Sequence, residues 1–214
     1  MKKLVLLALL LMLPASALAE TVGYAGDDLY IKSYTAENGE TLYYTGGIET
    51  DFVKSEDVNF DGVSDIVAMT RMGASNCAYV FFIKTENGYL HASETVWNYE
   101  LDKERGLVVS HTSDGYAGVL HETKLYRWQG GELELIRAAY SKERASVSLD
   151  GEKITETTYL RDIDISVIDY EHPLSETNDG EYMNEIFSEN VSLEDESGYL
   201  DAYNRERAAL YEGL

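Results

Sequence analysis

The sequence predicts a mainly β protein: an antiparallel meander of hairpins, β-propeller-like or a twisted sandwich, with one C-terminal α-helix. Short runs rich in β-branched and aromatic residues alternate with turn dipeptides, which favours hairpins. These dipeptides are Asn38-Gly39, Asn87-Gly88, Gly130-Gly131 and Asp150-Gly151. Near the C-terminus the apolar spacing becomes helical. No clean sequence repeat accompanies the hairpins, so the pattern does not predict a full propeller.

Residues 1–19 are predicted to be a secretory signal peptide that lies outside the fold. Lys2 and Lys3 give a positive start, and the apolar stretch 4–13 is too short to span a bilayer. Residues 17–19 read Ala-Leu-Ala, the small-residue pattern of a cleavage site. We therefore expect cleavage after Ala19, a periplasmic or secreted location, and no membrane span in the mature chain.

The remaining residues, 20–214, are predicted to form a single β-rich domain. The chain has 39 Asp and Glu against 17 Lys and Arg, a net charge of −22, and losing Lys2 and Lys3 changes it to −22 − 2 = −24. Such a surface repels nucleic acid and anionic lipid. It attracts cations and basic proteins, although solubility alone also explains an acidic exported protein. Cys77 is the only cysteine, so no disulfide forms within the chain, and its role stays open.

Residues 57–65 carry the pattern of a calcium loop. Oxygen-bearing side chains recur at every second position, then Gly62 follows, and Asp65 comes three residues later. Calcium takes about six to eight oxygen ligands at short range, and a chain supplies them locally by curling around the ion. Gly62 permits that curl because it lacks a Cβ. The expected ligands are the side chains of Asp57, Asn59, Asp61 and Asp65 and the carbonyl of Val63.

The loop departs from the helix–loop–helix calcium pattern in its second half. The twelfth position is Ala68 where that pattern has a bidentate Glu. The run 66–69 is apolar and partly β-branched, which favours a buried strand. The sequence thus predicts a calcium loop that leads into a strand, with Asp65 as the closing ligand and a structural role for the ion. The alternative is an acidic turn between two strands, because Asp, Asn and Gly also favour turns.

The remaining strands are predicted in chain order. Residues 20–56 form strands around the turn 37–40, and 48–53 lead into the loop. Residues 78–83 are the most apolar run of the mature chain and predict the central buried strand. Trp97 is a candidate core residue. Leu125 and Tyr126 are the main apolar residues of a long predicted strand. Further strands are expected at 66–69, 89–90, 106–109, 119–128, 133–136, 152–170 and 182–191.

The last segment is predicted to be one helix over 192–212, laid on the sheet or on one of its edges. Residues 192–195 resemble a capping box with acids suited to a helix start. Leu200, Tyr203, Arg207 and Leu210 fall at helical spacing. Residues 172–180 are polar and turn-rich, which predicts a loop.

The sequence shows no set of catalytic groups, so we do not expect an enzyme. Cys77 has no assignable partner, and the four His residues lack a metal-binding spacing. His111 and His121 could meet across a hairpin. A carboxylate pair of the glycosidase kind has no specificity among 39 acids. The 17 Tyr residues could form a sugar- or protein-binding face, or simply cover a core.

From Asp57 to Ile136 the order of features resembles a family of exported bacterial proteins that carry one such calcium loop in a β-propeller-like fold. The features are the loop, an apolar strand, an aromatic strand with an Asn-Gly turn, a Trp-containing loop, Gly-Leu-Val-Val at 106–109, and 121–128 before a Gly-Gly turn. The best understood members look like inhibitors of lysozyme-type enzymes that act as immunity proteins against secreted peptidoglycan-cleaving toxins. The resemblance covers about eighty residues. It implies Asp57, Asn59, Asp61 and Asp65 as metal ligands.

The leading expectation is therefore a non-enzymatic, exported calcium-binding protein that binds another protein, with a basic peptidoglycan hydrolase as the concrete partner. Related inhibitors use a protruding Ser-Gly-x-Tyr loop, which this chain lacks. Its nearest equivalent is Ser-Asp-Gly-Tyr at 113–116, where Tyr116 is the candidate partner-binding residue. The alternative is an envelope or surface module that binds glycan or builds structure, with calcium as a staple.

Overall fold

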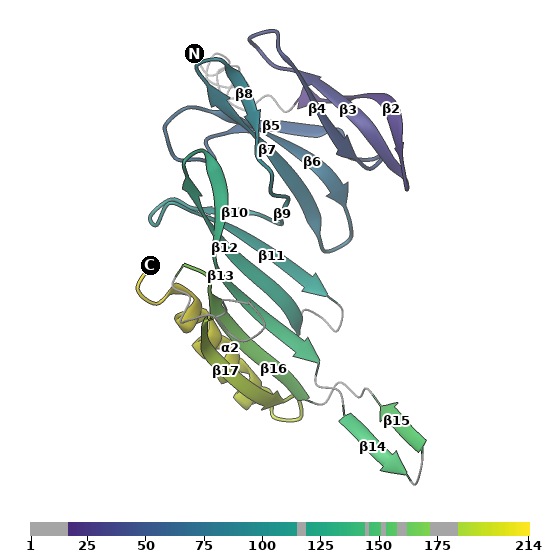
Figure 1. Ribbon diagram of the computed structural model, residues 1–214, viewed down its shortest axis with the longest axis vertical. Coiled ribbons are helices and arrows are strands. Elements are labelled where there is room, and N and C mark those ends of the chain that lie inside the picture. Colours follow the sequence, from purple (N-terminus) through teal and green to yellow (C-terminus); the bar gives the residue numbers. More distant parts are fainter. Residues whose placement is uncertain (1–16, 115–118, 144–145, 151–152, 158–161, 172–183) are drawn as a thin grey trace, which may run out of the picture. The chain divides into compact units, whose positions relative to one another are not determined.

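The protein is mainly β, with antiparallel sheets and one C-terminal helix, as the sequence predicts (Figure 1). Among the described residues there is no closed barrel or propeller. The chain falls into two compact units, Met1–Asn98 and Tyr99–Leu214, and the single domain over 20–214 stays a prediction. The computed structural model describes residues 17–114, 119–143, 146–150, 153–157, 162–171 and 184–214.

The first unit holds two antiparallel sheets. One has the strand order β1-β5-β6-β7-β8, with β9 paired to β7, and the other has the order β2-β3-β4. The strands are β1 Ala17–Leu18, β2 Glu20–Gly26, β3 Leu29–Thr35, β4 Thr41–Gly46, β5 Phe52–Glu56, β6 Asp65–Met72, β7 Cys77–Thr85, β8 Gly88–His91 and β9 Val96–Trp97.

The core of this unit lies between β4 and the larger sheet. Exposed and buried residues alternate along β4, so Leu42 and Tyr44 share its buried face. They pack with Val53, Ala68 and Phe82 of β5, β6 and β7. The predicted central strand is confirmed, because β7 lies inside the sheet and its apolar residues are buried.

The N-terminal strand β1 precedes the predicted cleavage point. Ala17 pairs with Val53 and Leu18 with Phe52. The Ala19 amide donates to the Asp51 carbonyl at 2.9 Å, and Ala19 belongs to the buried core. Residues 1–16 of the expected signal peptide lie outside the described residues, and cleavage after Ala19 stays a prediction.

The second unit is built on one antiparallel sheet with the order β10-β11-β12-β13-β16-β17. The predicted stretch 152–170 divides: β15 pairs with β14 in a separate hairpin, and only β16 joins the sheet. Leu125 and Tyr126 are buried as predicted. The strands are β10 Glu100–Asp102, β11 Leu107–Asp114, β12 Leu120–Gln129, β13 Glu132–Glu143, β14 Ser146–Asp150, β15 Lys153–Thr157, β16 Asp162–Asp169 and β17 Asn184–Ser192.

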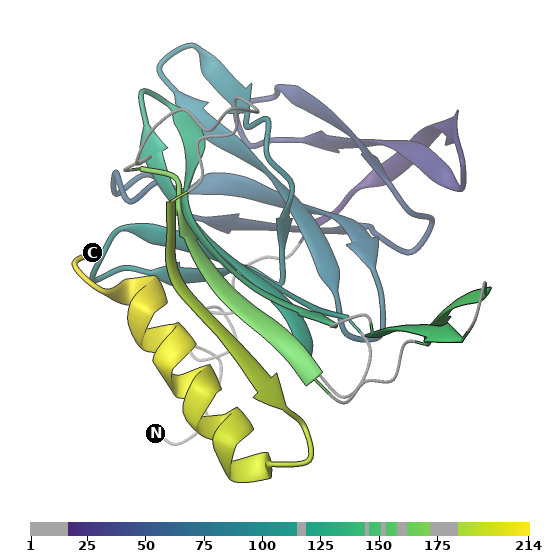
Figure 2. The same ribbon diagram turned by 60° about the horizontal axis from the view of Figure 1, so that its bottom comes forward.

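The C-terminal helix α2, Glu196–Tyr211, lies along one face of this sheet (Figure 2). The prediction of its start is wrong by four residues, because Ser192 still belongs to β17 and Asp195 is the N-cap, accepting from the Gly198 amide. The helix has no stretch of length and hydrophobicity suited to crossing a membrane, and neither has any other described helix.

The residues at helical spacing that predicted the helix are, apart from Leu210, not the ones that form its buried face. Leu210 is buried, but Leu200 is 57 % exposed and Arg207 is exposed. The buried line is instead Ala202, Glu206 and Leu210, spaced four residues apart. The apolar spacing of the sequence did not indicate this buried line because Glu206 lies in its middle, and an isolated Glu is seldom buried.

Candidate functional site

The predicted calcium loop connects β5 to β6. Glu56 pairs with Asp65 at the base of the hairpin, so residues 57–64 leave the sheet and return to it within one turn. Phe60 and Gly62 have positive φ angles of 64° and 84°. These left-handed residues curl the backbone, and Gly62 accepts its angle without a Cβ penalty. The predicted curl around Gly62 is confirmed.

Three of the predicted ligands meet inside the loop. The two Asp57 carboxylate oxygens accept from the amides of Asp61 and Gly62 at 3.2 and 3.0 Å. The Asn59 side-chain oxygen accepts from the Asp61 amide at 3.1 Å, and its Nδ2 donates to Asp61 Oδ2 at 3.0 Å. Asp61 Oδ1 accepts from the Val63 amide at 2.7 Å. The loop therefore gathers two carboxylates and one amide oxygen near its exposed tip.

Asp65 has different surroundings. Its side chain is fully buried, and its two oxygens accept from the backbone amides of Val58 and Lys84 at 3.1 and 2.9 Å. Burial raises the pKa of this carboxyl, the two amide bonds lower it in part, and the charges of Asp61 and Asp57 raise it further. In this structure Asp65 holds the start of the loop against β7, and its role as closing ligand stays a prediction.

The donor set suits a hard cation in part. Carboxylate and amide oxygens are calcium's preferred ligands, and Asp57, Asn59 and Asp61 supply them from every second position of the loop. Val63 is exposed at the loop exit, where its carbonyl remains the expected backbone ligand. Within the described residues, however, no three His, Cys, Asp or Glu side chains converge closely enough to hold a metal. The residues that would hold the ion are thus the tip residues, and Asp65 would have to turn to join them.

A second polar cluster lies in the other unit, between the sheet and α2. His121 Nε2 lies 3.0 Å from both carboxylate oxygens of Glu206, and both side chains are 2 % exposed. His121 Nδ1 is 3.2 Å from the hydroxyl of Ser141, and the His121 amide donates to that hydroxyl at 2.7 Å. The ring of His111 stacks on that of His121 at 6.1 Å, so the expected meeting of the two across a hairpin is confirmed.

Ser141 contacts His121, and His121 contacts Glu206, in the arrangement of a nucleophile with its base and orienting acid. The geometry favours packing instead. Ser141 is 7 % exposed, and its hydroxyl donates to the Val119 carbonyl at 2.7 Å. The rings of Tyr203 and His121 pack in a T-shaped arrangement, with their centroids 5.4 Å apart. We therefore interpret the cluster as the polar contact that fixes α2 to the sheet.

Sequence reasoning found the loop but missed Glu206. His121 and Glu206 are 85 residues apart, and no local spacing joins them. The signal that could have found the pair is the helical position of Glu206, halfway between Ala202 and Leu210. Tyr116 lies outside the described residues. Cys77 is half-buried at the start of β7 and is a free thiol.

Comparison of the chain with protein-family models, with curated proteins and with solved structures finds no match. The class that fold and site define is therefore a mainly β protein with an acidic hairpin loop. The resemblance to calcium-loop inhibitor proteins rests on the quoted residues alone.

Proposed function

We propose that this chain is an exported, non-enzymatic calcium-binding β protein that binds another protein. The observation that carries the proposal is the convergence of Asp57, Asn59 and Asp61 at the tip of the β5–β6 hairpin. Two carboxylates in one short loop repel each other, and a divalent cation bound by both would remove that repulsion. The ion would then act as a staple of the hairpin, in a chain with one cysteine and no internal disulfide.

Thermal unfolding with and without calcium tests the metal half of the proposal. An ion that binds only the folded state raises the free energy of unfolding by about 2.7 kcal/mol at a hundredfold excess over its dissociation constant. We expect a higher melting temperature in calcium than in chelator, and we expect Asp61→Ala to lose that difference. Asp164→Ala, on β16 of the other unit, is the matched control. Identical melting temperatures in calcium and chelator would reject the staple.

The net charge of −22 supports a basic protein as the partner. Opposite charges speed diffusional encounter, and this effect weakens with salt. A lysozyme-type cell-wall hydrolase is the concrete partner, with Tyr116 entering its cleft. Inhibition and association rates should be measured against several such enzymes at low and high salt. We expect an association rate that falls with salt, and weaker inhibition by Tyr116→Ala than by the control Tyr24→Ala. No binding at micromolar concentration to any of them would reject this partner.

A glycan-binding module is the second candidate function. One observation favours it, an aromatic cleft in the first unit that contains no residue of the calcium loop.

A further inference from the structure

The first unit contains a cleft of about 680 Å³ that is lined by residues of both its sheets. Residues of β3 and β4 line one side, and residues of β6, β7 and the segment 91–97 line the other. This volume lies within the range of about 300–1,000 Å³ that is typical of small-ligand sites. The cleft is thus large enough for a ligand, and its chemistry follows from its lining.

Three aromatic residues are among those that line the cleft. Tyr43 is 61 % exposed, whereas Tyr44, on the opposite face of β4, is 6 % exposed and donates its hydroxyl to the Thr50 carbonyl at 3.4 Å. Trp97, on β9, adds a third ring to the lining. Flat rings at the wall of an open cleft provide apolar faces of fixed orientation. Such faces can pack against the C–H face of a pyranose ring, and equally against any other flat apolar group.

Residues that carry a side-chain hydroxyl also line the cleft. Thr45, Thr70, Ser93 and Thr95 all line the cleft. A hydroxyl can both donate and accept a hydrogen bond, so the wall can satisfy a ligand that is itself covered with hydroxyls. The mixture of rings and hydroxyls favours a saccharide over a purely apolar ligand.

The charge of the lining is opposite to the charge of the chain. Arg71 lines the cleft, and among the described lining residues none is Asp or Glu, although the chain has 39 of them. Within the described part of the chain the Arg71 guanidinium makes no ion pair. His91 also lines the cleft, and burial lowers its pKa, which favours the neutral ring at neutral pH. Arg71 is thus left as the one formal charge of the described lining, and a guanidinium matches a carboxylate with two parallel hydrogen bonds.

We propose that this cleft binds a saccharide that carries a carboxylate, with the sugar ring against Tyr43 and the carboxylate on Arg71. The proposal gives a place and a ligand class to the glycan-binding alternative. It is independent of the calcium loop and of the protein partner proposed above.

Calorimetric titration of the purified full chain tests the ligand class without any variant. The probes are a galacturonic acid trimer and a hyaluronan tetrasaccharide, each beside its neutral methyl ester, with an acetylated tripeptide that ends in a free carboxylate. We expect at least about tenfold tighter binding of an acidic saccharide than of its ester, because a hydrogen-bonded charge pair is lost on esterification. Equal affinity for acid and ester, binding of the peptide alone, or no binding at millimolar concentration would overturn the proposal.

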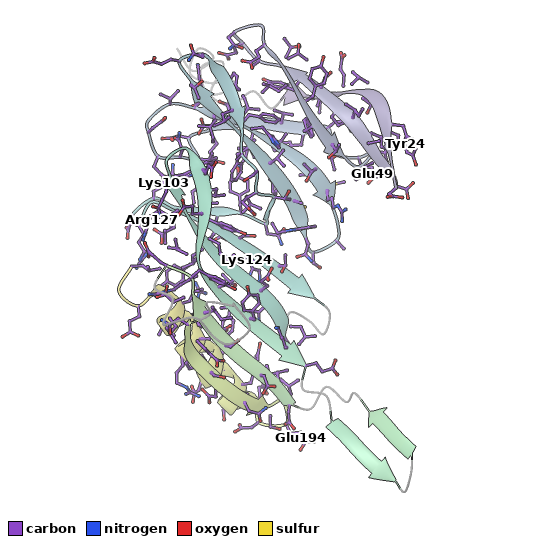
Figure 3. All side chains as sticks on the ribbon, in the orientation of Figure 1. Tyr24, Glu49, Lys103, Lys124, Arg127 and Glu194 are labelled. Atoms are coloured by element: carbon purple, nitrogen blue, oxygen red, sulfur yellow. The ribbon has the colours of Figure 1, made fainter. Side chains whose placement is uncertain are left out.

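Two variants locate the site, and both change side chains that are exposed. Arg71→Gln should weaken binding of the acid at least about tenfold and leave the ester unchanged. Tyr43→Ala should weaken both by about three- to tenfold. The controls are Tyr24→Ala and Arg205→Gln. Tyr24 is an exposed residue of β2 in the same sheet as Tyr43 (Figure 3), and it does not line the cleft; Arg205 lies on α2. If the controls weaken binding as much as the cleft variants, the site lies elsewhere and the proposal is wrong.

Discussion

The carboxylates of the β5–β6 loop and the carboxylate of Glu206 are stabilised in opposite ways. In the loop, Asp57 and Asp61 are bound by amides two to five residues away, at a tip open to solvent. Glu206 is 1 % exposed and has its partner on a strand 85 residues away. A local, hydrated network stabilises the shape of one turn. A buried, long-range pair stabilises the contact between two elements, and its loss exposes more of the fold.

Asp65 lies between these two cases. It belongs to the loop by sequence, yet it is fully buried and bound by amides on both sides of it in the chain. Burial, and not position in a motif, therefore distinguishes these carboxylates. The more deeply buried a carboxylate is, the more its substitution should lower the free energy of unfolding.

The largest loss of stability is expected for Glu206→Ala. Removing one partner of a buried pair leaves His121 without its acceptor and costs about 3–5 kcal/mol of the free energy of unfolding. Chemical denaturation measures it, with Glu196→Ala in the exposed first turn of α2 as the matched control. Glu206→Gln keeps an acceptor oxygen and should lose less. Equal stabilities of the two Ala variants would show that the buried pair contributes nothing.

The next largest loss is expected for Asp65→Ala. The amides of Val58 and Lys84 would lose their acceptor, and buried unsatisfied amides of this kind cost about 2–4 kcal/mol together. Asp65→Asn retains one acceptor oxygen and should fall between the wild type and Asp65→Ala. Denaturation in chelator isolates this effect from any bound ion. A loss as small as that of a surface substitution would place Asp65 with the exposed carboxylates.

A smaller loss is expected for Gly62→Ala. A Cβ at this position meets no atom within 4 Å, so the substitution tests the backbone angle of +84° alone. Holding a residue with a Cβ in the left-handed region costs about 1–2 kcal/mol. Gly39→Ala, at +84° in the turn between β3 and β4, is the matched control outside the loop. A markedly larger loss at Gly62 than at Gly39 would indicate that loop geometry adds its own constraint.

The smallest effect on stability is expected from a change of pH, through the protonation of His111. Burial lowers the pKa of His111, and the neighbouring His121 lowers it further. The unfolded chain then binds more protons than the folded one, so stability falls as the pH drops from about 6.5 through the folded pKa. Denaturation at about pH 7.5 and about pH 5.5 measures this slope, and His111→Gln should flatten it. An unchanged slope in that variant would assign the titration to other groups.

Local patterns predicted what local structure determines. The hairpin at Gly130 and Gly131, the curl at Gly62 and the buried strand β7 all follow from residues close in the chain. The single helix was predicted in type, but its start was misplaced because Ser192 pairs with Asp162 at the end of β17. That pairing joins residues 30 apart, and no capping pattern can weigh it against a helix start.

Long-range structure could not be predicted from the sequence, because local patterns do not report contacts between residues far apart in the chain. The buried line of α2 passes through Glu206, which becomes an interior residue only because His121 faces it. The cleft of the first unit takes its lining from two sheets, so Tyr43, Arg71 and Trp97 have no common pattern. The three predicted ligands that are close in the chain meet near the loop tip, whereas Asp65 accepts from the Lys84 amide on the next strand.

The pairing of β1 with β5 has a consequence for maturation. If a signal peptidase cuts after Ala19, it removes β1, the strand that covers the outer edge of β5. The acidic loop follows directly after β5 in the chain. The backbone groups of Val53 would then face solvent, and an uncovered strand edge is a template for adding a foreign strand. The processed chain would then present this edge of β5 for pairing with a strand of another chain.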